Sequence, residues 1–231
     1  VSVPSRTIKK ITSALLAEAW LENDRDKLFD IYKKSCITQY ILGLFIFLGI
    51  WCNVDFIFVI LPPEYAIGKW AIFWGCIANI IEMATGAASP LVGTSKHYKS
   101  QTYQSIILVG IIILANYLLI PIYGITGAAL ATAISFFIFS LIRHLYIVYR
   151  WNMQPFGREM VIATIAGVLV FGVMYLIPPI GHFIVNAAIR SLIISVMFGL
   201  IIYFSRISPD INNTIDAIAK KVPLISGIFK K

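Results

Sequence analysis

Charged residues are scarce in this chain of 231 residues. They make up 13% of the sequence, whereas hydrophobic residues make up 59% and the mean hydropathy is +0.84. A soluble globular domain has roughly 25% charged and about 45–50% apolar residues. A soluble core of this size cannot bury such an excess of apolar side chains, but lipid can surround them. The composition therefore predicts an integral membrane protein that crosses the bilayer several times.

Residues that build metal sites and catalytic centres are also few. The three cysteines, Cys36, Cys52 and Cys76, are isolated and odd in number, so we expect small apolar packing residues rather than disulfides or metal ligands. The sequence has no phosphate-binding loop and no glycine-rich dinucleotide turn, and its three histidines show no Ser or Cys partner pattern. We therefore expect no enzyme, no metal and no cofactor, and no hydrolysis of ATP by this chain.

The net charge is +8, with a pI near 9.4. A basic balance is one sign of a nucleic-acid-binding protein, but no basic run here is interleaved with aromatic residues of the kind that binds single strands. Cytoplasmic loops of membrane proteins carry an excess of Lys and Arg, which accounts for the charge without a nucleic acid partner. Membrane lipid is the partner that we expect instead.

Six long apolar runs are present, and prolines follow several of them. They cover residues 37–61, 67–89, 104–120, 125–149, 160–177 and 183–204. Backbone groups in hydrocarbon must be hydrogen-bonded within the protein, and the runs lack the alternation of barrel strands, so we expect helices. The sequence predicts an all-α, polytopic transmembrane helix bundle of about six full spans plus an N-terminal partial helix.

Lys and Arg alternate along the segments that connect these runs. They occur in residues 22–35, 90–101 and 150–159 and in the tail, and they are absent from residues 62–66, 121–124 and 178–182. The positive loops are expected on the cytoplasmic side, so the C-terminus is predicted to be cytoplasmic. The predicted parts are a helix end and cytoplasmic loop (1–35), the bundle (36–204) and a basic cytoplasmic tail (205–231).

Polar and ionisable residues inside the apolar runs are candidates for function, because each ion costs about 2.5–3.5 kcal/mol in hydrocarbon. Glu82 lies deep in the second run, where it either contacts a proton, a cation or a sugar hydroxyl, or pairs with a neighbouring helix. Asn53 and Asp55 complete a possible intramembrane polar site, although their place near the outer end of the first run favours an interfacial pair. Arg143 lies near a cytoplasmic helix end, and we attribute it to the Lys and Arg enrichment there.

A basic stripe runs along the N-terminal segment. Arg6, Lys9, Lys10 and Ser13 recur at spacings of three and four residues, so they share one face of a helix. Such a stripe could line a wet cavity and attract a phosphate group. The alternative is a surface helix whose basic face meets anionic lipid headgroups.

Residues 116–135 carry a motif. Its defining residues are Asn116, Pro121, Tyr123, Gly124, Gly127, Ala128 and Thr132. This stretch resembles the signature of the polysaccharide-type flippases, which belong to the MATE-like (MOP) superfamily. The stretches at 53–65 and 17–24 are similar to loop and helix-end sequences of the same family.

The resemblance implies a transporter made of two helix bundles, of which this chain would supply the second. The two bundles would rock about a central site and open it to each face of the bacterial inner membrane in turn. The cargo would be a lipid-linked sugar, an oligosaccharide on a polyprenyl pyrophosphate as in O-antigen and lipopolysaccharide synthesis. Arg6, Lys9 and Lys10 would hold the pyrophosphate, and the missing N-terminal bundle of the same protein would be the partner.

Two other functions remain open. A multidrug or cation antiporter of the same superfamily would need acidic cavity residues, for which Glu82 and Asp55 are the candidates. A non-transporting subunit of a membrane assembly predicts that deletion leaves surface polysaccharide in place but removes a co-purifying complex. A membrane-embedded glycosyltransferase is disfavoured, since no acidic or His pair faces a predicted wet loop.

Overall fold

The structure is a computed structural model, and it describes all residues except 1, 61, 63–64, 66–67, 179–182 and 222–231. Helices account for 88% of it, and the described residues contain no strand. The predicted all-α class is therefore confirmed for this part of the chain. The helices are α1 (Ser2–Glu22), α2 (Arg25–Trp51), α3 (Val54–Ile60), α4 (Lys69–Ala84), α5 (Ala88–Gly93), α6 (Tyr98–Trp151), α7 (Arg158–Leu176), α8 (Phe183–Ser205) and α9 (Pro209–Lys221).

Four of these helices, α2, α6, α7 and α8, are long and apolar enough to cross a membrane, by length and composition. An integral membrane location fits them. The predicted count of six spans is not confirmed. The third and fourth predicted runs both lie in α6, which has 54 residues, and the second run forms α4, whose 16 residues fall short of the about 20 that a span requires.

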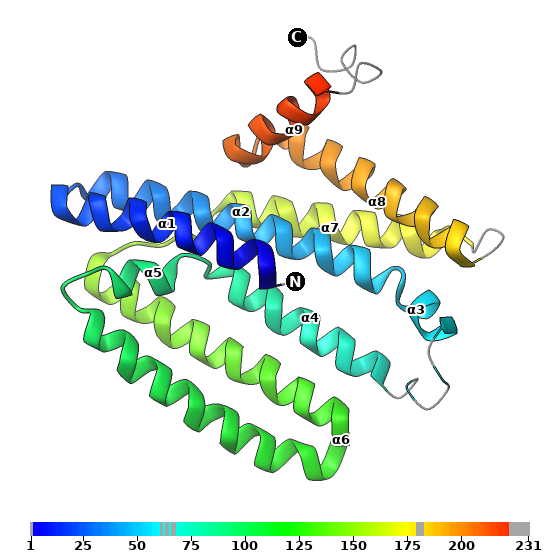
Figure 1. The fold of residues 1–231 in the computed structure, drawn as a ribbon, viewed down its shortest axis with the longest axis horizontal. Coiled ribbons are helices and arrows are strands. Elements are labelled where there is room, and N and C mark those ends of the chain that lie inside the picture. Colours follow the sequence, from blue (N-terminus) through cyan, green and yellow to red (C-terminus); the bar gives the residue numbers. More distant parts are fainter. Residues whose placement is uncertain (1, 61, 63–64, 66–67, 179–182, 222–231) are drawn as a thin grey trace.

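Helix α6 is a hairpin of two arms, as Figure 1 shows. The arms meet at Gly124, whose φ of 56° and ψ of −131° are not helical. Gly127 follows one turn later, and a Cβ atom there would lie 2.2 Å from the carbonyl oxygen of Leu119 on the first arm. At the other end of the hairpin, the hydroxyls of Ser100 and Tyr146 share a hydrogen bond of 2.8 Å. Two glycines thus allow the chain to reverse and the arms to approach closely.

Helix α2 lies in the middle of the bundle and packs against α1, α4, α7 and α8 (Figure 1). Its buried residues include Leu28, Tyr32 and Leu48, which belong to one continuous apolar core. The predicted boundary at residues 35 and 36 falls inside this unbroken helix. The predicted tail likewise includes a helix, α9.

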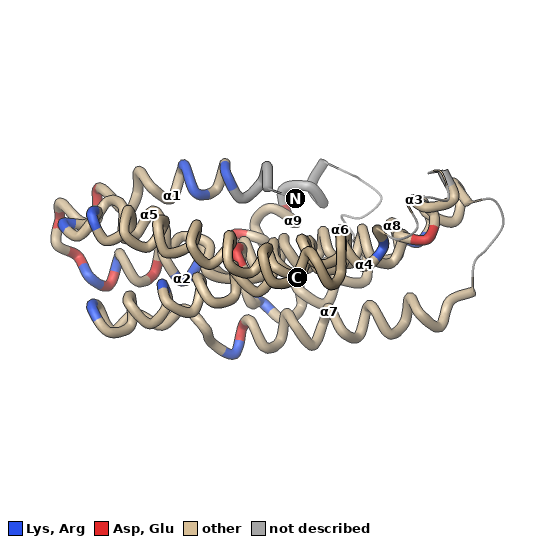
Figure 2. The backbone as a smooth tube through the Cα atoms, turned by 90° about the horizontal axis from the view of Figure 1, so that it is seen from below, with Lys and Arg blue, Asp and Glu red and all other residues tan. Residues whose placement is uncertain are grey.

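The three segments rich in Lys and Arg lie together at one end of the bundle, although residues 25–35 belong to α2 and are not the predicted loop. Lys33 forms an ion pair of 2.6 Å with Glu159, and Arg150 lies 2.9 Å from Nε2 of His97, so residues 22–35, 90–101 and 150–159 are neighbours. Figure 2 shows most of the charged residues gathered there, at the end that holds α5 and the start of α2. This clustering is what the alternation of Lys and Arg predicts for loops on one side of a membrane.

Helix α1 is fixed on the outside of α2 and α5 by apolar and polar contacts. Leu16 and Ala19 are fully buried, and Nε1 of Trp20 donates a hydrogen bond of 3.2 Å to the carbonyl oxygen of Leu91. The hydroxyls of Thr12 and Ser35 lie 3.3 Å apart. These contacts place the basic stripe of α1 beside the end of α4.

Candidate anion-binding cavity

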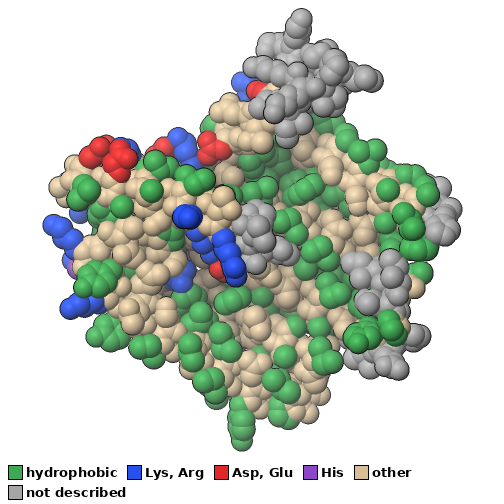
Figure 3. Space-filling model, viewed as in Figure 1, with side chains coloured by type: hydrophobic (Ala, Val, Ile, Leu, Met, Phe, Trp, Pro, Cys, Tyr) green, Lys and Arg blue, Asp and Glu red, His purple; other side chains and the backbone are tan. Residues whose placement is uncertain are grey.

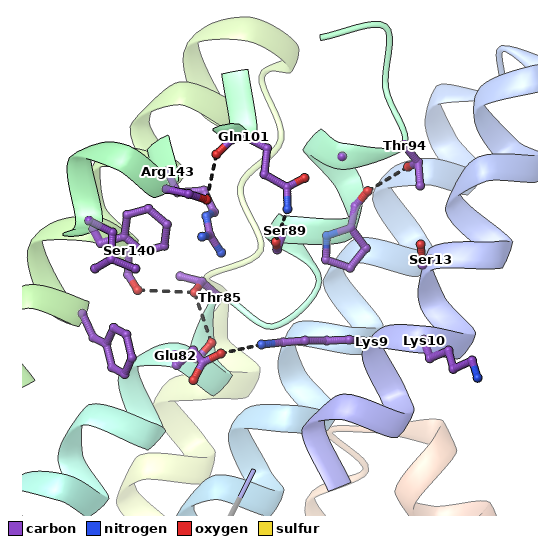
Figure 4. A pocket seen from close by; sticks show the side chains of 16 residues that line it. Lys9, Lys10, Ser13, Glu82, Thr85, Ser89, Thr94, Gln101, Ser140 and Arg143 are labelled. Carbon is purple, nitrogen blue, oxygen red and sulfur yellow. Dashed lines mark hydrogen bonds and ion pairs between the residues drawn. The ribbon is translucent and has the colours of Figure 1, made fainter. Parts of the chain in front are cut away.

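A cavity of about 520 Å³ lies between α1, α4, α5 and α6. Its polar lining comes from Lys9, Lys10, Ser13, Glu82, Thr85, Ser89, Thr94, Gln101, Ser105, Ser140 and Arg143. Figure 4 shows Lys9 reaching in from α1 and Arg143 from the opposite side, with Glu82 of α4 and the following residue, Thr85, between them. Figure 3 shows the same face from outside, where blue basic side chains stand over α1 and red acidic atoms lie behind them.

Glu82 and Lys9 form an ion pair across this cavity. Nζ of Lys9 lies 2.7 Å from Oε1 of Glu82, and the two side chains keep 23% and 41% of their surfaces exposed. Glu82 belongs to the last turn of α4, which ends at Ala84. The free carbonyls of a helix C-terminus carry a partial negative charge that disfavours a carboxylate. The positive charge of the lysine therefore compensates for the charges of both the carboxylate and the helix end. The sequence left open whether Glu82 is a functional contact or a paired carboxyl; the structure shows the pair.

Arg143 is the most buried basic group of the lining, with 9% of its surface exposed. Its guanidinium lies 4.1 Å from the ring centroid of Phe139. Among the described residues it forms no ion pair, and its buried Nε has no hydrogen-bond partner. Burial of a cation without a hydrogen-bonded counter-ion is unfavourable in free energy. The site is therefore suited to an anionic ligand that acts as the counter-ion.

Sequence reasoning missed Arg143 as a site residue, because its place near a helix end matched the enrichment of Lys and Arg in cytoplasmic loops. A usable signal was present. Phe136, Phe139, Ser140 and Arg143 recur at spacings of three and four, which puts them on one face of the second arm of α6, and all four line the cavity. A polar and aromatic stripe that ends in Arg on an otherwise apolar helix indicates an inward-facing surface.

The cavity favours negative ligands. Three basic side chains, Lys9, Lys10 and Arg143, line it beside the single carboxylate Glu82, which gives the described lining a net charge of +2. Lys10 is exposed and points away from Glu82 in Figure 4, so it stands at the rim. Hydroxyls such as those of Ser13 and Ser140 add neutral donors. Clustered cations and hydroxyls are the groups that bind phosphate oxygens.

The other predicted site residues lie elsewhere. Arg6 is exposed and does not line the cavity. Asp55 is paired with Lys69, keeps 76% of its side chain exposed and lines a separate cavity of about 300 Å³. Asn53 is buried and donates hydrogen bonds to the carbonyl oxygen of Gly49 (2.8 Å) and to Ser191 (3.2 Å). Of the residues predicted to form an intramembrane polar site, Glu82 is thus the one that lines the cavity together with its basic residues.

The motif residues lie around the reversal of α6 and do not line the cavity. Asn116 donates a hydrogen bond of 2.8 Å to the carbonyl oxygen of Ile112, and Thr132 donates one of 2.9 Å to that of Ala128. Pro121 lies inside the helix just before the reversal, and Tyr123 beside it is exposed.

The described residues contain no group of three or more His, Cys, Asp or Glu side chains placed to hold a metal ion. Cys36, Cys52 and Cys76 are free thiols. No protein-family model, curated protein or solved structure matches the chain. The resemblance at residues 116–135 therefore stays a prediction, and the cavity itself is the basis for assigning a function.

Proposed function

We propose that this chain is one bundle of a membrane transporter, a flippase that moves lipid-linked oligosaccharide across the bacterial inner membrane by alternating access. The observation that carries the proposal is the buried guanidinium of Arg143, which forms no ion pair with any described residue, in a cavity that Lys9 and Lys10 also line. The pyrophosphate of the cargo would be the anion that these groups bind.

The size and chemistry of the cavity support a phosphate ligand. Its volume of about 520 Å³ falls within the range of about 300–1,000 Å³ that is usual for ligand sites. Basic groups line the cavity from two different helices, Lys9 from α1 and Arg143 from α6, and in the proposal the diphosphate binds between them. Low-dielectric surroundings strengthen such contacts, since exposed ions are screened by water and buried ones are not.

The arrangement of the helices suits alternating access. The cavity lies on an open face of the bundle, beside the exposed part of α1 (Figure 3). In the proposal, a second bundle, the N-terminal one of the same protein, covers this face and rocks against it. The proposed topology has six spans, with α4 and both arms of α6 crossing the membrane and the C-terminus in the cytoplasm.

The cation antiporter is the weaker candidate. It requires a carboxylate free to bind a cationic cargo, and Glu82 is already paired with Lys9. Asp55 is likewise paired, with Lys69. The net positive lining repels a cation, so the geometry favours an anionic cargo.

Export of surface polysaccharide tests the proposal. In a strain that lacks its own copy, Arg143→Gln in the full protein should reduce export by about 10-fold to 100-fold, because a charge-assisted hydrogen bond contributes ~1.5–3 kcal/mol. Lys69→Gln is the matched control, since it removes a cation outside the cavity, and export should stay normal. Normal export by an Arg143→Gln protein at wild-type abundance would exclude the cavity as the cargo site. No loss of export on deletion of the gene would favour the non-transporting subunit.

A further inference from the structure

Lys9 is engaged before any ligand arrives. Its ammonium group lies 2.7 Å from the Glu82 carboxylate, so among the described lining residues Arg143 and the rim residue Lys10 are the cations that form no ion pair. A phosphate group that contacts Lys9 must compete with that carboxylate. The pair joins residues 73 positions apart and depends on the packing of α1 against α2 and α5, which brings Lys9 to the end of α4.

The pair is of a kind that can exchange partners. Both side chains keep part of their surfaces exposed to the cavity, and partly exposed ion pairs are weak because water screens them. The carboxylate also sits in the last turn of α4, where the helix dipole disfavours it. A phosphate carries more negative charge than a carboxylate and offers more acceptor oxygens, so it is the stronger partner for the same lysine.

The charged groups around Glu82 are few. Lys9 faces it from α1, and Arg143 lies on α6 close enough to attract it electrostatically. Helix α2, which also packs against α4, places no charged side chain in the lining among the described residues. Glu82 is therefore in direct contact with Lys9 and attracts Arg143 only at longer range.

We propose that Glu82 is a resident counter-anion, which holds Lys9 in the empty cavity and is exchanged for the phosphate of the ligand on binding. This role rests on the proposed function. It partly neutralises the empty site, so that the affinity for an anion is high enough for binding and low enough for release. It also lowers the charge that the empty protein exposes within the membrane.

Binding of inorganic pyrophosphate to the purified full protein, measured by titration calorimetry, tests this role. Glu82→Gln keeps the size of the side chain and removes its charge, and we expect pyrophosphate to bind about tenfold more tightly than to the wild type. Asp55→Asn is the matched control, because it removes the acidic partner of Lys69 outside the cavity and should leave the affinity unchanged. Glu82→Asp keeps the charge and should stay within a few-fold of the wild type.

A double-mutant cycle separates exchange at Lys9 from a general rise in anion affinity caused by removal of the negative charge of Glu82. If Glu82 competes for Lys9, the gain from Glu82→Gln should largely disappear in a Lys9→Gln background. An equal gain in both backgrounds, or no gain in either, would overturn the exchange while leaving the anion site in place. Failure of the folded wild type to bind pyrophosphate at all would instead remove the anion site, and the proposed function and the exchange with it.

Discussion

Substitution of Gly127 by Ala tests the reversal of α6 most sharply. The new methyl group would lie 2.2 Å from the carbonyl oxygen of Leu119 and 3.0 Å from Cβ of Tyr123. A backbone carbonyl cannot move aside as a flexible side chain can, so the two arms must separate. Overpacking of this kind typically costs about 1–3 kcal/mol.

Gly110→Ala is the matched control, because it lies on the first arm of the same hairpin and a Cβ atom there meets nothing within 4 Å. It should be neutral or stabilising by up to about 1 kcal/mol, since Ala is the better helix former. In detergent, the melting temperature should fall by at least about 2 °C for Gly127→Ala, as one kcal/mol shifts a chain of this size by roughly 2–4 °C. Equal melting temperatures for the two variants would refute the close approach of the arms.

Two further predictions concern the ends of the helices and the partner bundle. Arg190 donates a hydrogen bond of 2.6 Å to the carbonyl oxygen of Ile177, where α7 ends, so Arg190→Leu should destabilise the bundle by about 1.5–3 kcal/mol and lower its melting temperature; an unchanged melting temperature would contradict this. The intact mass of the native protein, taken from its own membrane, should be near twice the 25.8 kDa of this chain if a second bundle belongs to the same protein. A mass equal to 25.8 kDa would instead require a pairing of two copies.

The helical architecture could be predicted because it depends on local features. Apolar runs without backbone partners must form helices in lipid, and residues 121–124 show the reversal through a proline and a glycine. The count of spans is harder, because α4 ends at Ala84, inside the run predicted to reach residue 89, and because the third and fourth runs are joined in α6. Where helices stop inside an apolar run depends on packing, which composition does not encode.

The cavity could be predicted in part. The spacing of Lys9 and Lys10 on α1 indicated a basic face, and the cost of Glu82 in an apolar run marked it as a candidate. Their ion pair could not be foreseen, since it joins positions 73 residues apart through tertiary packing. Arg143 was missed for a related reason, because burial distinguishes a cavity cation from a loop cation, and burial is a property of the packed bundle.

Transfer of the cargo itself tests the central claim most directly. The full protein would be reconstituted into liposomes that contain a polyprenyl-pyrophosphate-linked oligosaccharide, and the fraction of lipid accessible from outside would be followed with time. We predict that the wild type speeds transfer between leaflets and that Arg143→Gln slows it at least about tenfold, with Lys69→Gln unaffected. Equal rates for wild type and Arg143→Gln, or no transfer by the correctly folded wild type, would contradict a phosphate-binding transport cavity.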